Sequence, residues 1–542
     1  MKPDTVSVPG PLPRRGGGLA RYAGVTGVAT LASRLLGLGR DQVLAWFFGA
    51  SNEMDAFVVA FRIPNLVRDL FAEGAMSAAF VPTFTRQLTL KGKGDAWRLA
   101  NNVLTALLLS TGALVVLGIA FARPMIETYA GDFASVPGKL ELTVRLTRVM
   151  LPFLTMVAVA AAMMGMLNSL HHYFIPALSP AMFNIATIAG AFILVPAMPS
   201  LGLPPIMAIA FAALAGGLGQ IAIQWPSLRR EGFRYAPVFD PRDPVLRRVL
   251  ILMGPGTIGL AATQVNLFIN TLLATSQGTG AASWLTYAFR LMYLPIGLFG
   301  VSIGTAVLPA VSRCAAVGDT AGIRSTVSRG LGMMLMLNVP ATVGLFVLAT
   351  PIVQLLFERG RFLPADTAAT AAAARFYAIG LAGYSAVRIA SPTFYAIGDS
   401  RVPAMVSGGA IAVNVIASVA LVRTIGFQGL ALGTSIASIA NGAALVWLLR
   451  RRLGNLDGRR LSATFIKVTA SSAVMAIASI AIQHTMVRIL PGSGLVAQLV
   501  RLAASIGGGM VALACTAKIL RVDEFGDSVE MIRARVRMLL NR

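Results

Sequence analysis

The stretch VLTALLLSTGALVVLGIAFA at residues 103–122 carries no charged side chain and is long enough to cross a lipid bilayer as one helix. Similar apolar runs recur along the chain, which is 56% hydrophobic and only 13% charged and has a mean hydropathy of +0.73. Ordinary soluble domains are about 25% charged, so no soluble fold of 542 residues buries this much apolar surface. The runs are also longer than the alternating segments of a membrane β-barrel. We therefore predict an all-α polytopic membrane protein.

Polar and Pro/Gly-rich breaks divide the chain into about fourteen candidate transmembrane helices. The loops rich in Lys and Arg, such as 229–248 and 450–460, follow the even-numbered spans. Positive residues favour the cytoplasmic side, so this pattern places both termini in the cytoplasm and explains the net charge of +24 without nucleic acid. Twelve spans remain if either 20–48 or 54–85 does not cross the bilayer. The candidates are 20–48, 54–85, 97–122, 143–168, 176–196, 204–226, 246–275, 283–311, 327–356, 367–395, 403–424, 428–449, 463–487 and 494–519.

The chain contains an internal repeat. AFRIPNL at 60–66 is similar to AFRLMYL at 288–294, an offset of 228 residues that becomes 227 further along, where Arg148 matches Arg375. The offset spans six helices, an even number, so both copies have the same orientation and are related by an axis along the membrane normal. Two parallel lobes with polar residues between them are typical of alternating access, although channels can also be duplicated.

The repeat predicts two six-helix lobes plus two C-terminal helices. The expected parts are a cytoplasmic, disordered tail (1–19), an N-lobe (20–230), a cytoplasmic linker (231–245), a C-lobe (246–452), helices 13 and 14 (453–520) and a cytoplasmic basic tail (521–542).

Several charged residues lie within these apolar spans, where each costs about 2.5–3.5 kcal/mol near the bilayer centre. At 100° per residue, Asp55, Arg62, Asp69 and Glu73 fall within about 40° of one another, which predicts a polar stripe along one helix. Arg290 is the repeat mate of Arg62, and we expect the two to face each other across the lobe interface.

The surplus of positive charge indicates an anionic ligand. Local pairing explains Arg68 with Asp69, but it does not explain Arg290, whose neighbours are Phe289 and Tyr293 and which we expect to have no acid nearby. Guanidinium groups match phosphate geometry, so a lipid-linked diphosphate would fit.

Other chemistry is not indicated. The two cysteines, Cys314 and Cys515, are too few for a disulfide framework or a Cys-based metal site. No Ser/His/Asp set, Walker motif or Gly-rich phosphate loop stands out. We predict a transporter without catalytic residues or a bound cofactor, rather than an enzyme or an ATP-driven pump.

Two stretches resemble a known family. SRLLGLGRDQVLAWFFGASNEMDAFVVAFRIPNLVRDLFAEGAMSAAFVPTF (33–84) resembles the start of the bacterial lipid II flippases of the MurJ/MviN family, and SWLTYAFRLMYLPIGLFGVSIGTAVLPAVSR (283–313) resembles their eighth helix. The resemblance implies the fold of the multidrug/oligosaccharidyl-lipid/polysaccharide exporter superfamily, with a V-shaped central cavity. It implies a bacterial inner-membrane protein that moves lipid II, an undecaprenyl-diphosphate-linked precursor, to the periplasmic leaflet for peptidoglycan synthesis. Membrane lipids and the cell-wall synthesis machinery would be its partners.

The resemblance also implies a set of substrate-binding residues and a groove for the lipid tail along helices 13 and 14. Arginines bind the diphosphate in this family, and Asp41 would partner Arg40. The matching positions are Arg34, Arg40, Asp41, Asp55, Arg62, Asn65, Arg68, Glu73, Ser283 and Arg290.

The sequence leaves two alternatives for the driving force of transport, the membrane potential and a sodium gradient. Some relatives bind sodium through carboxylates between helices 7, 11 and 12, but the roughly matching residues here are Asn270, Asn414, Ser418 and Thr434. Because none has a carboxylate, the membrane potential is the more attractive driving force, with sodium as the alternative.

Two other functions share part of this pattern. An oligosaccharide-lipid flippase or a cation-coupled drug exporter would share the fold, but an exporter of cations should line its cavity with acids. A non-transporting scaffold or receptor would tolerate loss of the buried arginines.

Overall fold

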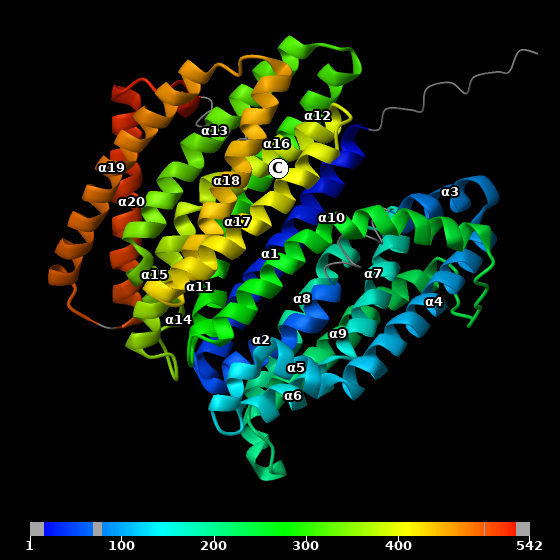
Figure 1. The fold of residues 1–542 in the computed structure, drawn as a ribbon. Coiled ribbons are helices and arrows are strands. Elements are labelled where there is room, and N and C mark those ends of the chain that lie inside the picture. Colours follow the sequence, from blue (N-terminus) through cyan, green and yellow to red (C-terminus); the bar gives the residue numbers. More distant parts are fainter. Residues whose placement is uncertain (1–15, 69–78, 493, 527–542) are drawn as a thin grey trace, which may run out of the picture. The chain divides into compact units, whose positions relative to one another are not determined.

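The computed structural model describes residues 16–68, 79–492 and 494–526, and every regular element in those ranges is helical (Figure 1). This confirms the predicted all-α fold. Within the described residues, nine helices or helix pairs are long and apolar enough to cross a bilayer, while the total of fourteen stays a prediction. The nine are Lys93–Ala120, Lys139–Ser169, Phe174–Ala197, Met207–Arg230, Thr320–Val347, Arg401–Ile425, Gln428–Leu453, Gly458–Ile489 and Leu495–Ile519.

The helices form two compact units, and each is described by itself. Unit 1 takes its described residues from the ranges Met1–Arg40, Phe71–Val116 and Pro152–Gly254. It contains α1 (Gly16–Phe48) as far as Arg40, α3 (Val81–Lys91), most of α4 (Lys93–Ala120), α7 (Phe153–Ser169), α8 (Phe174–Ile193), η3 (Val195–Ala197), η4 (Pro199–Leu201), α9 (Met207–Arg230) and the start of α10 (Pro244–Thr275).

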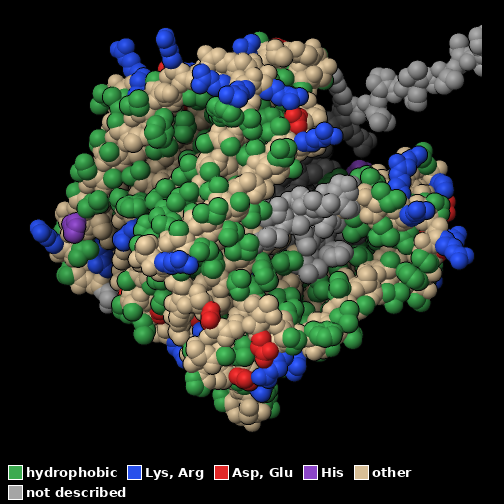
Figure 2. Space-filling view, viewed as in Figure 1, with side chains coloured by type: hydrophobic (Ala, Val, Ile, Leu, Met, Phe, Trp, Pro, Cys, Tyr) green, Lys and Arg blue, Asp and Glu red, His purple; other side chains and the backbone are tan. Residues whose placement is uncertain are grey.

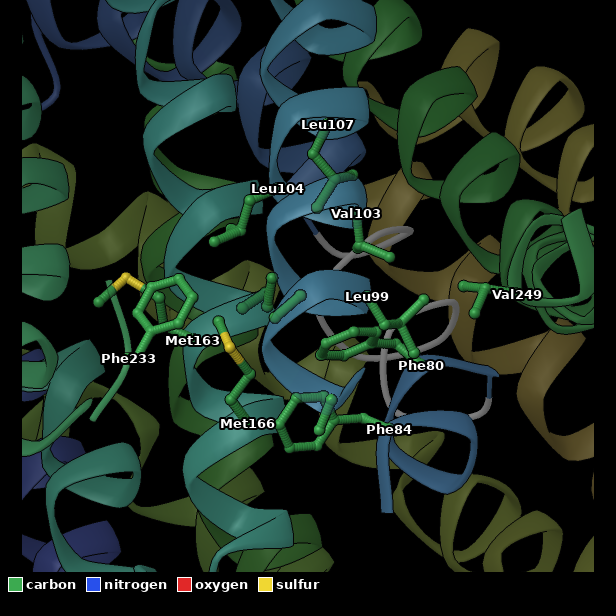
Figure 3. Packing of buried hydrophobic residues seen from close by; sticks show 14 of the residues in the cluster. Phe80, Phe84, Leu99, Val103, Leu104, Leu107, Met163, Met166, Phe233 and Val249 are labelled. Carbon is green, nitrogen blue, oxygen red and sulfur yellow. The ribbon is translucent and has the colours of Figure 1, made fainter. Parts of the chain in front are cut away.

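The core of unit 1 is formed where α3, α4 and α7 meet (Figure 3). Leu99, Val103 and Leu107 recur every fourth residue and therefore share one face of α4. Phe80, which immediately precedes α3, and Phe84 of α3 pack against this cluster with their ring centroids 5.5 Å apart. These interlocking apolar side chains fix α3 and α4 in unit 1.

The linker after α9 is fastened to α4. Asn102 Nδ2 donates to Asp240 O at 3.1 Å, and Asp240 N donates to Asn102 Oδ1 at 2.9 Å. Asn101 Nδ2 also donates to Arg234 O at 3.2 Å. The polar segment between α9 and α10 is therefore ordered by two neighbouring asparagines of unit 1.

Unit 2 takes its described residues from Asp41–Leu70, Leu117–Leu151 and Pro255–Arg542. Besides the rest of α1, α4 and α10, it contains α2 (Asn52–Arg68), α5 (Ala122–Ala130), η2 (Gly131–Ser135), α6 (Lys139–Met150), α11 (Ala281–Pro295), η5 (Ile296–Gly300), α12 (Val301–Ala316), α13 (Thr320–Val347), α14 (Ala349–Phe357), α15 (Pro364–Ile379), α16 (Leu381–Ala396), α17 (Arg401–Ile425), α18 (Gln428–Leu453), α19 (Gly458–Ile489) and α20 (Leu495–Ile519).

The last two helices lie side by side, with α19 packed on α13 (Figure 1). Glu524, which follows α20, is only 2% exposed and ties this end to α19, because its carboxylate lies 3.0 Å from Arg460 Nη2 and accepts from Thr464 Oγ1 at 3.0 Å. Large exposed apolar side chains such as Ile477 and Val511 line the outer surface of the pair. Hydrophobic side chains cover much of the visible face in Figure 2, as suits helices that face lipid.

Several predicted spans consist of two helices. The span predicted at 143–168 is interrupted at Leu151–Pro152, between α6 and α7, where proline removes a backbone donor. The span predicted at 367–395 is interrupted at Gly380, where an added Cβ would lie 2.7 Å from Ser435 Oγ. The predicted lobes also stay a prediction, and unit 2 combines residues from both halves of the sequence.

Candidate functional site

Asp55 lies at the centre of a polar cluster in unit 2 that includes a second predicted site residue, Ser283. Asp55 is fully buried, and its carboxylate accepts from Gly280 N at 2.7 Å, Ser283 N at 3.1 Å and Ser283 Oγ at 2.7 Å. These donors stand at the N-terminus of α11, where unpaired N–H groups and the helix dipole favour an anion. Asp55 of α2 thus caps α11, and we name these three bonds the α2–α11 contact.

The same carboxylate is paired with Lys139, a residue that the sequence analysis missed. Lys139 Nζ lies 2.9 Å from Asp55 Oδ2, and the two side chains are only 2% and 1% exposed. Lys139 is the first residue of α6 and follows Gly138, whose φ of +76° turns the chain into that helix. A lysine next to a Pro-Gly turn at the start of an apolar span was the available signal.

Arg290 has an acidic partner, so the expectation that no acid stands near it was wrong. Its Nε lies 3.4 Å from Asp41 Oδ2. The Asp41 side chain is 10% exposed, whereas that of Arg290 is 53% exposed. Asp41 belongs to α1 and Arg290 to α11, and sequence neighbours alone could not show that these helices meet in unit 2. The pair leaves about half of the Arg290 side chain exposed.

Arg62 lies about two helical turns beyond Asp55 on α2 and is half-buried. Its Nε donates to Thr271 Oγ1 of α10 at 3.2 Å. Beside it, the rings of Tyr129 and Phe268 stack with centroids 4.2 Å apart. The aromatic wall and Thr271 orient the guanidinium group, while the predicted opposition of Arg62 and Arg290 stays a prediction.

Arg34 and Arg40 lie in unit 1. Arg40 is buried, donates from Nη1 to Asn184 Oδ1 at 3.1 Å and has its Cζ 5.3 Å from the centroid of the Phe183 ring. Asn184 in turn donates to Ser33 O at 3.1 Å, which joins α8 to α1. Arg34 is exposed. Asn184 is a second residue that the sequence analysis missed.

Fewer contacts are described for the remaining candidate residues on the second predicted span. Asn65 is half-buried, and its Oδ1 is buried without a hydrogen-bond partner among the described residues. Arg68 ends α2, but its side chain lies outside what the structure describes, and Glu73 lies in the gap between 68 and 79.

The four residues matched to a sodium site do come together in unit 2, with Asn266 added. Asn414 Nδ2 donates to Asn266 Oδ1 at 2.6 Å and to Asn270 Oδ1 at 2.9 Å. Asn270 Nδ2 donates to Thr434 Oγ1 at 3.0 Å, and Ser418 Oγ donates to Asn414 Oδ1 at 3.4 Å. These neutral groups satisfy one another, so the set is a poor fit for a cation. Sodium coupling stays a prediction.

The turn between α1 and α2 is held by the loop between α14 and α15. Arg361 N donates to Trp46 O at 2.9 Å, and Arg361 Nη1 lies 3.3 Å from Glu53 Oε2. Gly49 and Gly360 have φ angles of +59° and +60°. A Cβ on Gly49 would collide with Arg361 O, and a Cβ on Gly360 would collide with Trp46 Cδ1. Glycine is therefore required on both sides of this contact.

The chain is similar to known lipid II flippases along most of its length. A sequence model of the family described as "Lipid II flippase MurJ" matches residues 44–500. A lipid II flippase MurJ of Burkholderia cenocepacia is 35% identical over 427 residues, which cover 78% of this chain and 82% of the relative. A probable lipid II flippase MurJ of Rhizobium meliloti is 35% identical over 438 residues, covering 79% of this chain and 81% of the relative.

Solved structures show the same fold. A lipid II flippase MurJ in an inward closed conformation superposes with a TM-score of 0.74 at 25% identity, covering 91% of this chain and 99% of that one. An inward-facing multidrug resistance MATE family transporter of the MOP superfamily gives a TM-score of 0.67 at 17% identity, covering 80% and 99%. The second likeness concerns the fold alone.

Proposed function

Because this chain belongs to the lipid II flippase MurJ family, we propose that it moves lipid II from the cytoplasmic to the periplasmic leaflet of the bacterial inner membrane by alternating access. The apolar helices support a multi-pass membrane protein, and membership of the family supports a transport role. The fold supports the mechanism, since similar transporters are known in inward-facing and outward-facing forms.

The observation that carries this proposal is the half-exposed side chain of Arg290. Its partner Asp41 is almost enclosed, yet the Arg290 side chain is 53% exposed. Because the Arg290 side chain is half-exposed, an incoming dianion can reach it from solvent and compete, with its two charges, against the single charge of Asp41. A diphosphate also offers the several oxygens that a guanidinium fork binds. Asp41 would then occupy Arg290 whenever the substrate is absent.

The other predicted arginines would also bind the diphosphate. Arg62 donates to Thr271 and Arg40 donates to Asn184, so a neutral side chain helps to orient each guanidinium group. We propose that Arg34, Arg40, Arg62, Arg68 and Arg290 bind the diphosphate in the course of the cycle. Ser283 and Asp55 would act through the α2–α11 contact.

The topology and energy source follow the sequence predictions. We propose cytoplasmic termini, two six-helix lobes that rock against each other, and a lipid-tail groove along α19 and α20, whose outer faces are apolar. The neutral asparagine network supports the membrane potential as the driving force. Cell-wall synthesis enzymes would receive the product.

The test measures lipid II on the outer leaflet of a flippase-depleted strain that is complemented with variants, with and without the membrane potential. Arg290→Ala and Arg40→Ala should each abolish outer-leaflet lipid II and growth while the folded protein persists. Arg423→Ala, which removes an exposed arginine at the end of α17, is the matched control and should complement. Normal growth of both site variants, or altered drug tolerance without any change in lipid II, would contradict the proposal.

A further inference from the structure

The Asp55 carboxylate is held from two directions, and the two sets of bonds join different helices. Three bonds come from Gly280 and Ser283 and join α2 to α11. The fourth comes from Lys139 Nζ at 2.9 Å and joins α2 to α6. A carboxylate that is 1% exposed is stable only when it is both hydrogen-bonded and paired with a positive charge.

Contacts with an aromatic ring and with the packed helices α6 and α2 hold Lys139 in position. The ammonium group lies 4.0 Å from the centroid of the Phe133 ring, an apolar face that attracts cations. Its backbone carbonyl accepts from Thr143 Oγ1 at 2.8 Å, and α6 packs along α2. Phe133 belongs to the apolar cluster that also contains Val59 of α2. The lysine thus reaches Asp55 from a helix that is fixed to α2 by hydrophobic packing.

We propose that Lys139 is a positioning residue of the transport cycle: its ammonium group neutralises Asp55 so that the α2–α11 contact can close over a buried carboxylate. This inference rests on the proposed alternating access, in which the α2–α11 contact forms and breaks. When α11 moves away, water reaches Asp55 from the vacated side and solvates its charge. When α11 returns, that water is expelled, and the Lys139 ammonium group stabilises the charge of Asp55 in place of the water.

The charge balance makes a specific prediction for a double-mutant cycle. Lys139→Met leaves the carboxylate without its counter-ion in the closed state, and Asp55→Asn leaves the ammonium group buried without a carboxylate. Each single change should therefore favour opening. The double variant encloses no charge at all, so it should close better than either single variant, since replacing both members of a buried pair costs far less than removing one.

Opening can be measured directly at the hydrogen bonds themselves. The amide protons of Gly280 and Ser283 are donated to Asp55, so their exchange with deuterium requires the α2–α11 contact to break. Mass spectrometry of peptides covering 279–285 reads this exchange on purified, substrate-free protein. The matched control is the amide of Gly322, which is bound by Asp319 within the N-terminal cap of α13 at 2.8 Å and should exchange alike in all variants.

Lys139→Met should speed exchange at Gly280 and Ser283 by about a hundredfold, and Lys139→Arg should stay within about threefold of wild type. The double variant with Asp55→Asn should exchange more slowly than either single variant. If Lys139→Met does not fold, Lys139→Gln takes its place. The proposal is overturned if the singles leave exchange unchanged, if arginine fails to rescue, or if the double variant exchanges as fast as the faster single. Because no substrate is present, these outcomes are independent of whether lipid II is the cargo.

Discussion

Replacing Ser283 with alanine removes one of the four hydrogen bonds to Asp55 and leaves the other three in place. The lost bond joins Ser283 Oγ to Asp55 Oδ1 at 2.7 Å, at a residue that is 0% exposed. A hydrogen bond to a charged group contributes about 1.5–3 kcal/mol. Oδ1 still accepts from Ser283 N at 3.1 Å, so the loss should lie at the lower end, at about 1.5–2 kcal/mol. That shifts the opening equilibrium of the α2–α11 contact about 10- to 30-fold.

The assay is deuterium exchange at the Gly280 amide. In the Ser283→Ala variant this amide keeps its hydrogen bond to Asp55, so faster exchange reports opening of the α2–α11 contact. Exchange should accelerate by about the same 10- to 30-fold. Thr286→Ala is the control, because Thr286 Oγ1 donates to Ala282 O within its own helix at 2.8 Å. The reasoning is refuted if Ser283→Ala stays within about twofold of wild type, or if both variants accelerate exchange equally.

Three further changes test other contacts by thermal unfolding in detergent. Gly360→Ala should lower the stability by about 1–2 kcal/mol, because the position has φ +60° and no room for a Cβ; an unchanged Tm would exclude the strain. Asn414→Leu should cost about 1–2 kcal/mol by leaving Asn266 Oδ1 without its donor, and a rise in Tm would show that the network is not stabilising. The pKa of Glu231 is lowered, first by the hydrogen bond from His172, so its contribution to stability is complete above the usual carboxyl pKa and is lost as the pH falls through the lowered pKa. Glu231→Gln should therefore lower the Tm at about pH 7 but not at about pH 3, and an equal effect at both would contradict this.

The long apolar helices were predictable because hydropathy is a local property of the chain. The spans predicted at 403–424, 428–449 and 494–519 correspond to α17, α18 and α20 within a few residues. The interruptions were not predictable in the same way, because they depend on neighbours. Gly380 divides α15 from α16 where the backbone approaches Ser435, and hydropathy carries no information about that approach.

The candidate site was predictable by residue type but not by pairing. Asp55 and Ser283 were both predicted as site residues, and the structure joins them. The acid beside Arg290 was missed because Asp41 is far from it along the chain, and a one-dimensional pattern does not show which helices become neighbours. Lys139 was missed for a different reason. Basic residues at span ends are commonly membrane anchors, so its position gave no sign of a buried ion pair.

Asp55 and Ser283 are 228 residues apart, which is the offset of the internal repeat, so the two ends of this hydrogen bond occupy the same position in each copy. Equivalent positions that touch must lie on the axis relating the copies, where an ancestor with identical halves would have set each residue against its own duplicate. Two aspartates there would oppose carboxylate to carboxylate, which disfavours ionisation of both. An aspartate and a serine can meet on such an axis only after the copies have diverged. Under the duplication predicted from the sequence, this contact is therefore a position at which the two copies had to acquire different residues.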